Sequence, residues 1–253
     1  MRGLFIIAAL ASAVGLATPA LAQHEDVPLL QGKWSFAGPF GTFDRAAAQR
    51  GFQVYKEVCG NCHSMRLVAY RNLEAIGLSE EQIKDIAASY TFSGDIDDSG
   101  DPVDRKGLPS DRFHSPFANA NAARAANGGA LPPDLSLIVK AREGGANYIY
   151  SLMQGFKDPP SGMKVPDGQH FNLYFPGHFL AMPQPLQDDQ VTYADGTKAT
   201  IEQMAHDVAT FLAFTAEPEM EARKRMGVKI VLFLTLLTGL TYAVKRKIWA
   251  NVH

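Results

Sequence analysis

The sequence predicts a mainly α-helical protein with long loops and a single membrane-spanning helix at its C-terminus. Three observations predict this class. Apolar residues recur at helical spacing in several segments, no convincing run of alternating residues indicates strands, and a continuous apolar run occupies residues 228–244. The 253 residues are 46% hydrophobic and 20% charged, as in an ordinary globular chain. The net charge of −2 argues against a general nucleic-acid binder.

The N-terminus has the pattern of a secretory signal. Arg2 gives a positive start, residues 4–14 are apolar, and residues 20–22 (Ala-Leu-Ala) form a small-residue cleavage site. We therefore expect residues 1–22 to be a signal peptide that is removed before Gln23. A retained membrane anchor is the alternative, although the apolar run is short for a span.

The apolar run near the C-terminus is about the minimum length that crosses a bilayer as a helix. Basic residues and a tryptophan follow it, as is typical of an interfacial anchor. A buried core helix is the alternative. We expect residues 23–221 to form one domain, residues 222–247 the transmembrane helix and residues 248–253 a cytoplasmic tail. The signal peptide then predicts a periplasmic domain on a single-pass protein of the bacterial inner membrane.

The first and last helices of the domain are the clearest. Apolar residues at i, i+4, i+7 and i+11 predict a helix over residues 44–58. Thr200 and Gln203 form a capping-box pattern at the start of the last helix, and Pro218 bends the chain just before the span. The domain is therefore predicted to stand on a nearly continuous helical stalk. Shorter helices are predicted at residues 66–75, from Ser79 onward, from Pro133 to Gly144 and at residues 147–154.

Two long segments, residues 92–130 and 156–198, show no clear helical pattern and are predicted to be loops. Loops of this length are usually functional or disordered. Their aromatic residues indicate that these loops pack against an apolar group, and a bound haem would provide one. These aromatic residues are Phe113, Phe117, Phe171, Tyr174, Phe175 and Phe179.

Residues 59–63 read Cys-Gly-Asn-Cys-His, the C-x-x-C-H pattern at which haem is attached in c-type cytochromes. The two intervening residues let both thiols reach the vinyl groups of one macrocycle, and the adjacent histidine lies on the axial side of the iron. We predict one covalent haem c, attached through Cys59 and Cys62 and ligated by His63. The domain is thus predicted to be a c-type cytochrome whose long loops wrap one haem, with electron transfer as its function.

Three other interpretations of the motif are less favourable. A zinc site needs three or four protein ligands, and the chain has no second cysteine pair. A thioredoxin-like redox pair expects a strand before the motif, where this sequence predicts a helix. A structural disulfide across two intervening residues would be strained.

The second axial ligand of a haem electron carrier is commonly a methionine. Met163 and Met182 both lie in a Pro/Gly-rich segment, whereas the other methionines lie in the signal, near His63, on predicted helical faces or at the membrane junction. Prolines stiffen the chain around Met182, which favours it. Met163, or His170 or His178 in a bis-histidine site, are alternatives.

Four stretches carry more specific patterns: residues 59–65, residues 122–136 (Ala-Ala-Arg-Ala-Ala-Asn-Gly-Gly-Ala-Leu-Pro-Pro-Asp-Leu-Ser), residues 174–183 and residues 216–227. In this order, over almost the whole mature chain, they resemble the cytochrome c1 family, the haem subunit of the cytochrome bc1 complex. The resemblance implies Met182 as the axial ligand. It also implies that Arg124, with its permanent charge, approaches a haem propionate.

Two departures from the family pattern are visible. Gly128 stands where the family often has asparagine, and Pro183-Gln184-Pro185 stands where it usually has Ala-Pro-Pro. Neither departure removes a ligand.

The resemblance also implies a function. The haem would accept an electron from the Rieske iron–sulfur protein and reduce a soluble cytochrome c, within a dimeric quinol–cytochrome c oxidoreductase that includes cytochrome b. The alternative is a membrane-anchored c-type carrier that shuttles alone to an oxidase. A haem enzyme such as a peroxidase, with an open iron site, is a third class.

Five aspartates cluster within residues 95–104: Asp95, Asp97, Asp98, Asp101 and Asp104. Such a patch can steer a basic cytochrome c toward the domain. A merely solvated acidic loop is the alternative. A calcium loop is disfavoured, because Lys106 stands where that loop needs glutamate.

Overall fold

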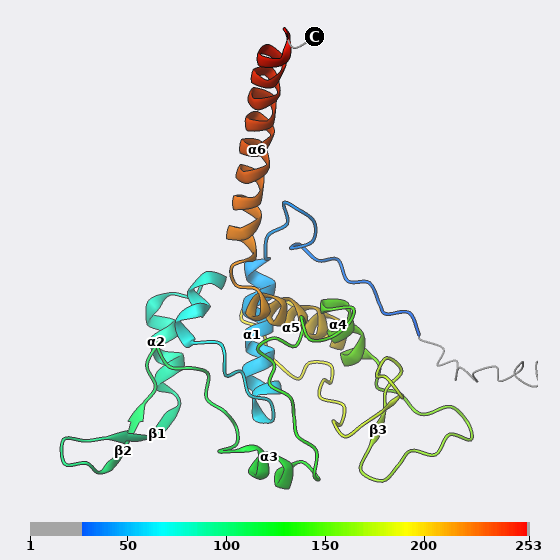
Figure 1. The fold of residues 1–253 in the computed structure, drawn as a ribbon. Coiled ribbons are helices and arrows are strands. Elements are labelled where there is room, and N and C mark those ends of the chain that lie inside the picture. The colour runs from blue at the N-terminus through cyan, green and yellow to red at the C-terminus, as the bar shows by residue number, and fades with distance from the viewer. Residues whose placement is uncertain (1–26, 252–253) are drawn as a thin grey trace, which may run out of the picture.

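The computed structural model describes residues 27–251 (Figure 1). The expected signal peptide, residues 1–22, lies outside the described residues. A domain of helices and long loops carries one long C-terminal helix, as the sequence predicted. The elements in chain order, with η marking 3-10 helices, are α1 (Arg45–Glu57), η1 (Cys59–Asn61), η2 (Tyr70–Ile76), α2 (Glu80–Ala88), β1 (Thr91–Ile96), β2 (Pro102–Lys106), α3 (Ala120–Ala126), α4 (Ala146–Gln154), β3 (His170–Phe171), β4 (Phe179–Leu180), α5 (Ile201–Ala216) and α6 (Met220–Trp249).

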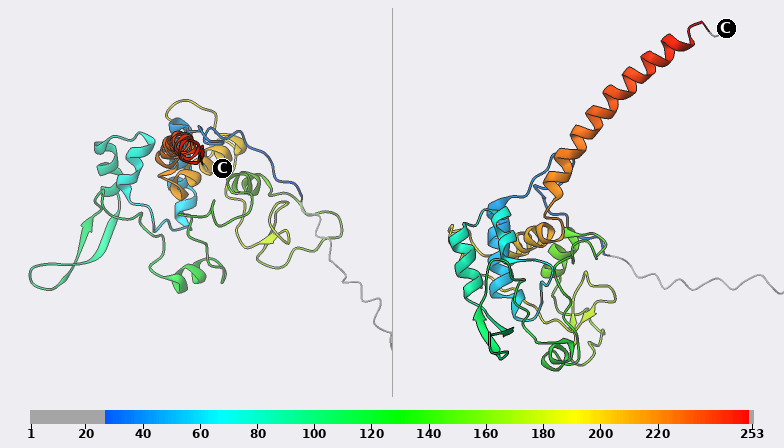
Figure 2. Two further views of the ribbon diagram at one scale, coloured as in Figure 1. Left: turned by 45° about the horizontal axis from the view of Figure 1, so that its top comes forward. Right: turned by 60° about the vertical axis from the view of Figure 1, so that its left-hand side comes forward.

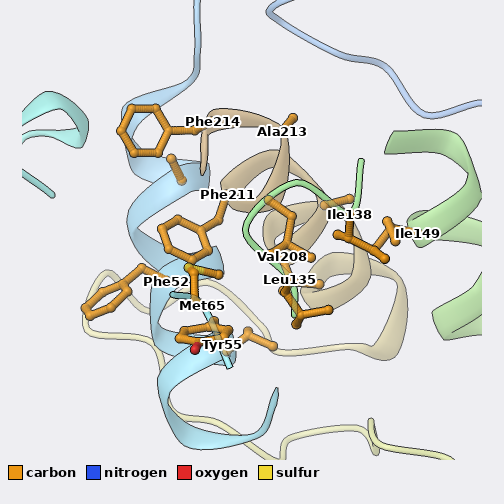
Figure 3. Close-up of a cluster of buried hydrophobic side chains, with 14 of the residues drawn as sticks. Phe52, Tyr55, Met65, Leu135, Ile138, Ile149, Val208, Phe211, Ala213 and Phe214 are labelled. Carbon is orange, nitrogen blue, oxygen red and sulfur yellow. The ribbon is translucent and has the colours of Figure 1, made fainter. Parts of the chain in front are cut away.

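The core of the domain is centred on α1 and α5, and α4 packs against α5 (Figure 1). Gly51 permits a close approach of α1 to α5, because a Cβ atom there would lie 2.0 Å from the Asp207 carbonyl oxygen. Beside this crossing, the rings of Phe52 and Phe211 lie 5.6 Å apart (Figure 3). Phe211 is fully buried, so its ring contributes about 1.5–3 kcal/mol of hydrophobic stabilisation.

A buried ion pair also fastens α1 to α5. The Asp207 side chain is 0% exposed and accepts hydrogen bonds from Arg50 Nε at 2.9 Å and Arg50 Nη2 at 3.0 Å. Gln203 donates a third hydrogen bond at 3.0 Å. Burial alone would raise the pKa of the Asp207 carboxyl, but interactions with His206, Arg50 and Gln203 outweigh burial and lower it. The negative charge of the buried carboxylate is therefore balanced by Arg50 and by its hydrogen bonds inside the domain.

The strongly patterned helices form as predicted. The predicted helix at residues 44–58 is α1, and the last domain helix is α5. At α2, Ser79 and Gln82 form the complete capping box, each side chain accepting a hydrogen bond from the other residue's backbone N–H. At α5, Thr200 accepts from Gln203 N at 3.1 Å, but the Gln203 side chain turns to Asp207, so only half of that predicted box forms.

Three predictions about local structure were wrong. The expected loop at residues 92–130 contains α3 and an antiparallel hairpin, β1–β2; the hairpin is largely exposed and therefore shows no apolar alternation. The helix expected from Pro133 to Gly144 forms only turns, and the Asp134 carboxylate accepts hydrogen bonds from the segment after the C-x-x-C-H motif. The helix expected at residues 66–75 begins only at Tyr70 and is a 3-10 helix.

Helix α6 is the one helix in residues 27–251 that is long and apolar enough to cross a membrane, and its apolar window is not buried against the domain. It begins four residues after α5 ends, but the chain turns sharply between the two helices, so α5 lies across the domain core and does not continue the axis of α6 (Figures 1 and 2). The prediction of a nearly continuous helical stalk was therefore wrong, because the apolar residues of α5 pack into the core. Glu221 secures the junction through a double contact with Arg45 on α1, at 2.8 and 2.9 Å.

Candidate haem site

The C-x-x-C-H motif lies directly after α1, at the end that points away from α6 (Figure 1). The chain tightens there into the 3-10 turn η1, in which Cys62 N and His63 N both donate to the Cys59 carbonyl, at 3.1 and 2.9 Å. Gly60 suits this turn, because a Cβ atom there would lie 3.1 Å from the Tyr55 carbonyl oxygen. Two thiols and one imidazole are thus gathered within a single turn.

The imidazole of His63 is held by one of its two nitrogens. Its Nδ1 lies 2.8 Å from the Pro133 carbonyl oxygen, and since a carbonyl only accepts, Nδ1 carries the proton. Burial lowers the pKa of His63, which favours the neutral ring. A neutral imidazole protonated at Nδ1 offers the lone pair of Nε2 to a metal, and such an outer hydrogen bond fixes the orientation of a ligand histidine.

Asp134 fixes the loop that supplies this carbonyl. One carboxylate oxygen accepts from Ser64 Oγ and from Arg66 N, both at 2.8 Å, and the other accepts from Ser136 N at 2.9 Å. Ser136 Oγ accepts in turn from Leu67 N at 3.0 Å. Burial works to raise the pKa of Asp134, but hydrogen bonds from Ser136, Arg66 and Ser64 together lower it. This clasp joins the segment after His63 to the segment around Pro133.

The two cysteines are free thiols in different surroundings. Cys62 is exposed, whereas Cys59 is partly buried, and burial raises the pKa of its thiol to about 12. Catalytic redox cysteines have a lowered thiol pKa. The raised value at Cys59 therefore argues against thiol–disulfide exchange as the function of the motif.

The candidates for the second axial ligand differ in their surroundings. Met182 follows β4 and packs, partly buried, against the core, whereas Met163 lies in a loop and is 39% exposed. His178 places Nδ1 3.3 Å from the Asn172 carbonyl oxygen, and His170 is exposed at the start of β3. The partly buried position of Met182, just after β4, favours it over the exposed Met163 as the second axial ligand.

Arg124 lies exposed on α3, and its Nη1 donates to the Gly129 carbonyl at 3.0 Å. Helix α3 begins at the Asn119 cap, whose side chain accepts from Ala122 N at 2.9 Å. The turn that Arg124 contacts leads directly to the Pro133–Asp134 loop. Arg124 thus lies in the same stretch of chain as Pro133, whose carbonyl orients His63. Within residues 27–251, no contact joins Arg124 to the motif itself.

These residues fit a covalently bound haem. The motif offers two thiols for thioether bonds and an imidazole with Nε2 available for iron, and Met182 is the candidate for a thioether ligand. Sequence reasoning missed the clasp of Asp134, Ser64 and Ser136. Its only signal was an aspartate directly after a proline pair and two residues before a serine, a pattern that does not reveal partners about 70 positions away.

Comparison with known proteins decides the family. The family model for cytochrome c1 matches residues 34–252, which is most of the chain. The chain belongs to the cytochrome c1 family. Cytochrome c1 of Rhodospirillum rubrum is 50% identical over 249 residues, covering 92% of each chain. Mitochondrial cytochrome c1 heme protein of Saccharomyces cerevisiae is 50% identical over 220 residues, covering 87% of this chain and 71% of the yeast protein.

A longer relative, the cytochrome b/c1 protein of Bradyrhizobium diazoefficiens, is 49% identical over 243 residues, and the chain spans 35% of that protein's length. Covalent haem c is the cofactor of the cytochrome c1 family, so this member of the family is a haem-carrying electron-transfer protein. The candidate membrane helix α6 agrees with a membrane-anchored member of the family.

Proposed function

We propose that this chain is the electron-transfer subunit of a dimeric cytochrome bc1 complex, beside cytochrome b. In this proposal it accepts one electron from the Rieske iron–sulfur protein and passes it to a soluble cytochrome c. The haem domain lies on the periplasmic side of the bacterial inner membrane. The observation that carries the proposal is the C-x-x-C-H turn with its oriented His63, in a chain that matches cytochrome c1 over most of its length.

Bound haem supplies a reversible one-electron change of its iron. The chain's residues set where and at what potential this change occurs. Cys59 and Cys62 would hold the group covalently, His63 and Met182 would ligate its iron, and Arg124 would compensate a propionate charge. A neutral imidazole and a thioether together favour the reduced iron and raise the potential.

The acidic hairpin is the proposed docking element for the soluble partner. Four aspartates, Asp97, Asp98, Asp101 and Asp104, are exposed on β1–β2 or its connecting turn, and the hairpin projects on the side away from α6 (Figure 1). Opposite charges raise association rates over distances of about a Debye length, roughly 10 Å at 0.1 M salt. A basic cytochrome c would therefore be guided toward the haem-bearing end of the domain.

Purification in mild detergent distinguishes this function from its alternatives. A subunit of the bc1 complex should bring down a haem b protein and a Rieske protein with it, whereas a carrier that shuttles alone to an oxidase should come down without them. Carbon monoxide should not bind the reduced native protein, because Met182 occupies the sixth position. Rapid binding would instead support an open iron site, as in a peroxidase, and would contradict ligation by Met182.

A further inference from the structure

The loop before α1 is an exposed, uncharged and largely apolar turn beside the start of α6. Its tip, residues 37–40 (Ala-Gly-Pro-Phe), is exposed throughout, and the Phe40 side chain is 78% exposed. The sequence contains no charged residue between Lys33 and Asp44. A large aromatic side chain that is this exposed adds little to the core and is available to an apolar partner outside the domain.

Hydrogen bonds fix the loop at one position along the axis of α6. Lys224 Nζ donates to the Phe36 carbonyl at 2.6 Å and to the Gly41 carbonyl at 3.1 Å, so it binds both ends of the turn. The apolar run of α6 begins at Val228, four residues further on, which at 1.5 Å per residue is about 6 Å along the helix axis. The loop therefore lies just outside the hydrocarbon layer that α6 would cross (Figures 1 and 2).

The surroundings match the charge of a lipid surface. Arg225 and Lys229 are exposed on the first turns of α6, shortly after Lys224 in the sequence, and Arg223, also exposed, is paired with Glu217 at 3.0 Å. Basic side chains at this level attract anionic headgroups, and aromatic rings concentrate at the interface between headgroups and acyl chains. A protein partner would have to cover both the apolar tip and these cations, whereas a bilayer provides both environments at the depth that α6 sets.

We propose that residues 37–40 form a second membrane contact, with the Phe40 ring inserted into the interfacial layer of a bilayer that contains anionic lipid. The inference rests on the proposed membrane span α6. Two attachment points, one helix and one loop, would then determine the orientation of the haem domain above the membrane. A single spanning helix alone leaves rotation about its own axis unspecified.

The test is a depth measurement on the intact complex in nanodiscs of phosphatidylcholine and phosphatidylglycerol. A nitroxide at Phe40→Cys is the only label that this chain takes up, because haem attachment would consume Cys59 and Cys62 and the sequence has no other cysteine; the complex without the new cysteine gives the background from other subunits. Since the Phe40 ring packs against little, this substitution spares the core. Collisions with oxygen and with a nickel chelate report apolar and aqueous access. Leu234→Cys in the middle of α6 and Asp101→Cys at the hairpin tip are matched controls.

We expect the Phe40 label to show an oxygen-to-nickel accessibility ratio between those of the two controls and several-fold above that of the hairpin label. A ratio equal to that of the hairpin label would overturn the proposal and leave the span intact. Exclusion of both reagents would also overturn it, since it would place Phe40 against another subunit. A Leu234 label accessible to nickel would instead refute the span and, with it, the basis of the inference.

Discussion

Replacing Asp134 with asparagine tests whether the clasp next to the motif controls the haem ligand. The aspartate accepts three hydrogen bonds, two on one oxygen and one on the other. An amide has a single oxygen, so either orientation of the asparagine places its NH2 group against a backbone N–H, of Ser136 or of Arg66. At least one bond to a charged acceptor is lost, worth about 1.5–3 kcal/mol, and a donor is left unpaired.

The same substitution should raise the midpoint potential of the haem. Removal of the negative charge disfavours the ferric state, which carries one more positive charge than the ferrous state. Loosening the Pro133 carbonyl weakens its hydrogen bond to His63 Nδ1 and makes the imidazole a poorer donor to ferric iron. For a one-electron couple 59 mV corresponds to 1.4 kcal/mol, so an effect of about 1 kcal/mol raises the potential by about 40 mV.

Redox titration of Asp134→Asn measures this shift, and thermal unfolding of the same preparation measures stability. Asp167→Asn, at an exposed aspartate in a loop outside the clasp, is the matched control and should leave both quantities unchanged. A lower unfolding temperature with an unaltered or decreased potential would refute the reasoning. In that case Asp134 would stabilise the loop without influencing His63.

Four further predictions address the axial ligand, the docking surface, an ion pair and the core. Met182→Leu should keep the haem attached but lower its potential by roughly a few hundred millivolts, within the range that axial ligands command; an unchanged potential would mean that another residue is the ligand. Neutralising Asp97 and Asp98 together should slow reduction of a basic cytochrome c at low salt and have little effect at high salt; equal rates at every ionic strength would dismiss docking there. Because the folded-state pKa of Asp207 is lowered, its stabilising contribution is present above its unfolded pKa of about 3.9 and is lost as the pH falls through the folded value. The decrease in unfolding temperature between pH 5 and pH 3 should therefore be smaller in Asp207→Asn than in the parent. Phe211→Ala should lower the free energy of unfolding by about 3–5 kcal/mol in denaturant titration, and a cost below 1 kcal/mol would mean that the core around α5 repacks.

Sequence reasoning succeeded where the signal is local. The helix at α1 was predictable because its apolar face repeats over three turns, and α2 because both partners of its capping box lie within four residues. It failed where tertiary contacts or exposure override the pattern. The hairpin β1–β2 was missed because exposed strands bury no alternating face, and α3 because seven residues are too few to show a periodic stripe.

The site divides in the same way. Cys59, Cys62 and His63 are contiguous, so their chemistry could be proposed directly from the sequence. Met182 is separated from them by more than a hundred residues, and local chemistry alone left Met163 as an alternative until the family resemblance favoured one of the two. The Asp134 clasp was not predictable, because it depends on how residues 64–67 meet residues 133–136 in space.

The junction between the domain and α6 determines where a haem at the motif would lie. Arg45 and Glu221 bind the first turn of α6 to the first turn of α1, the same helix that ends at the haem motif. Helix α1 therefore connects the start of α6 to the C-x-x-C-H motif, and a haem held at the motif would keep a fixed position relative to α6. In the proposed bc1 complex, the electron donor and the electron acceptor would then each have to approach this haem, because the haem itself would not move between them.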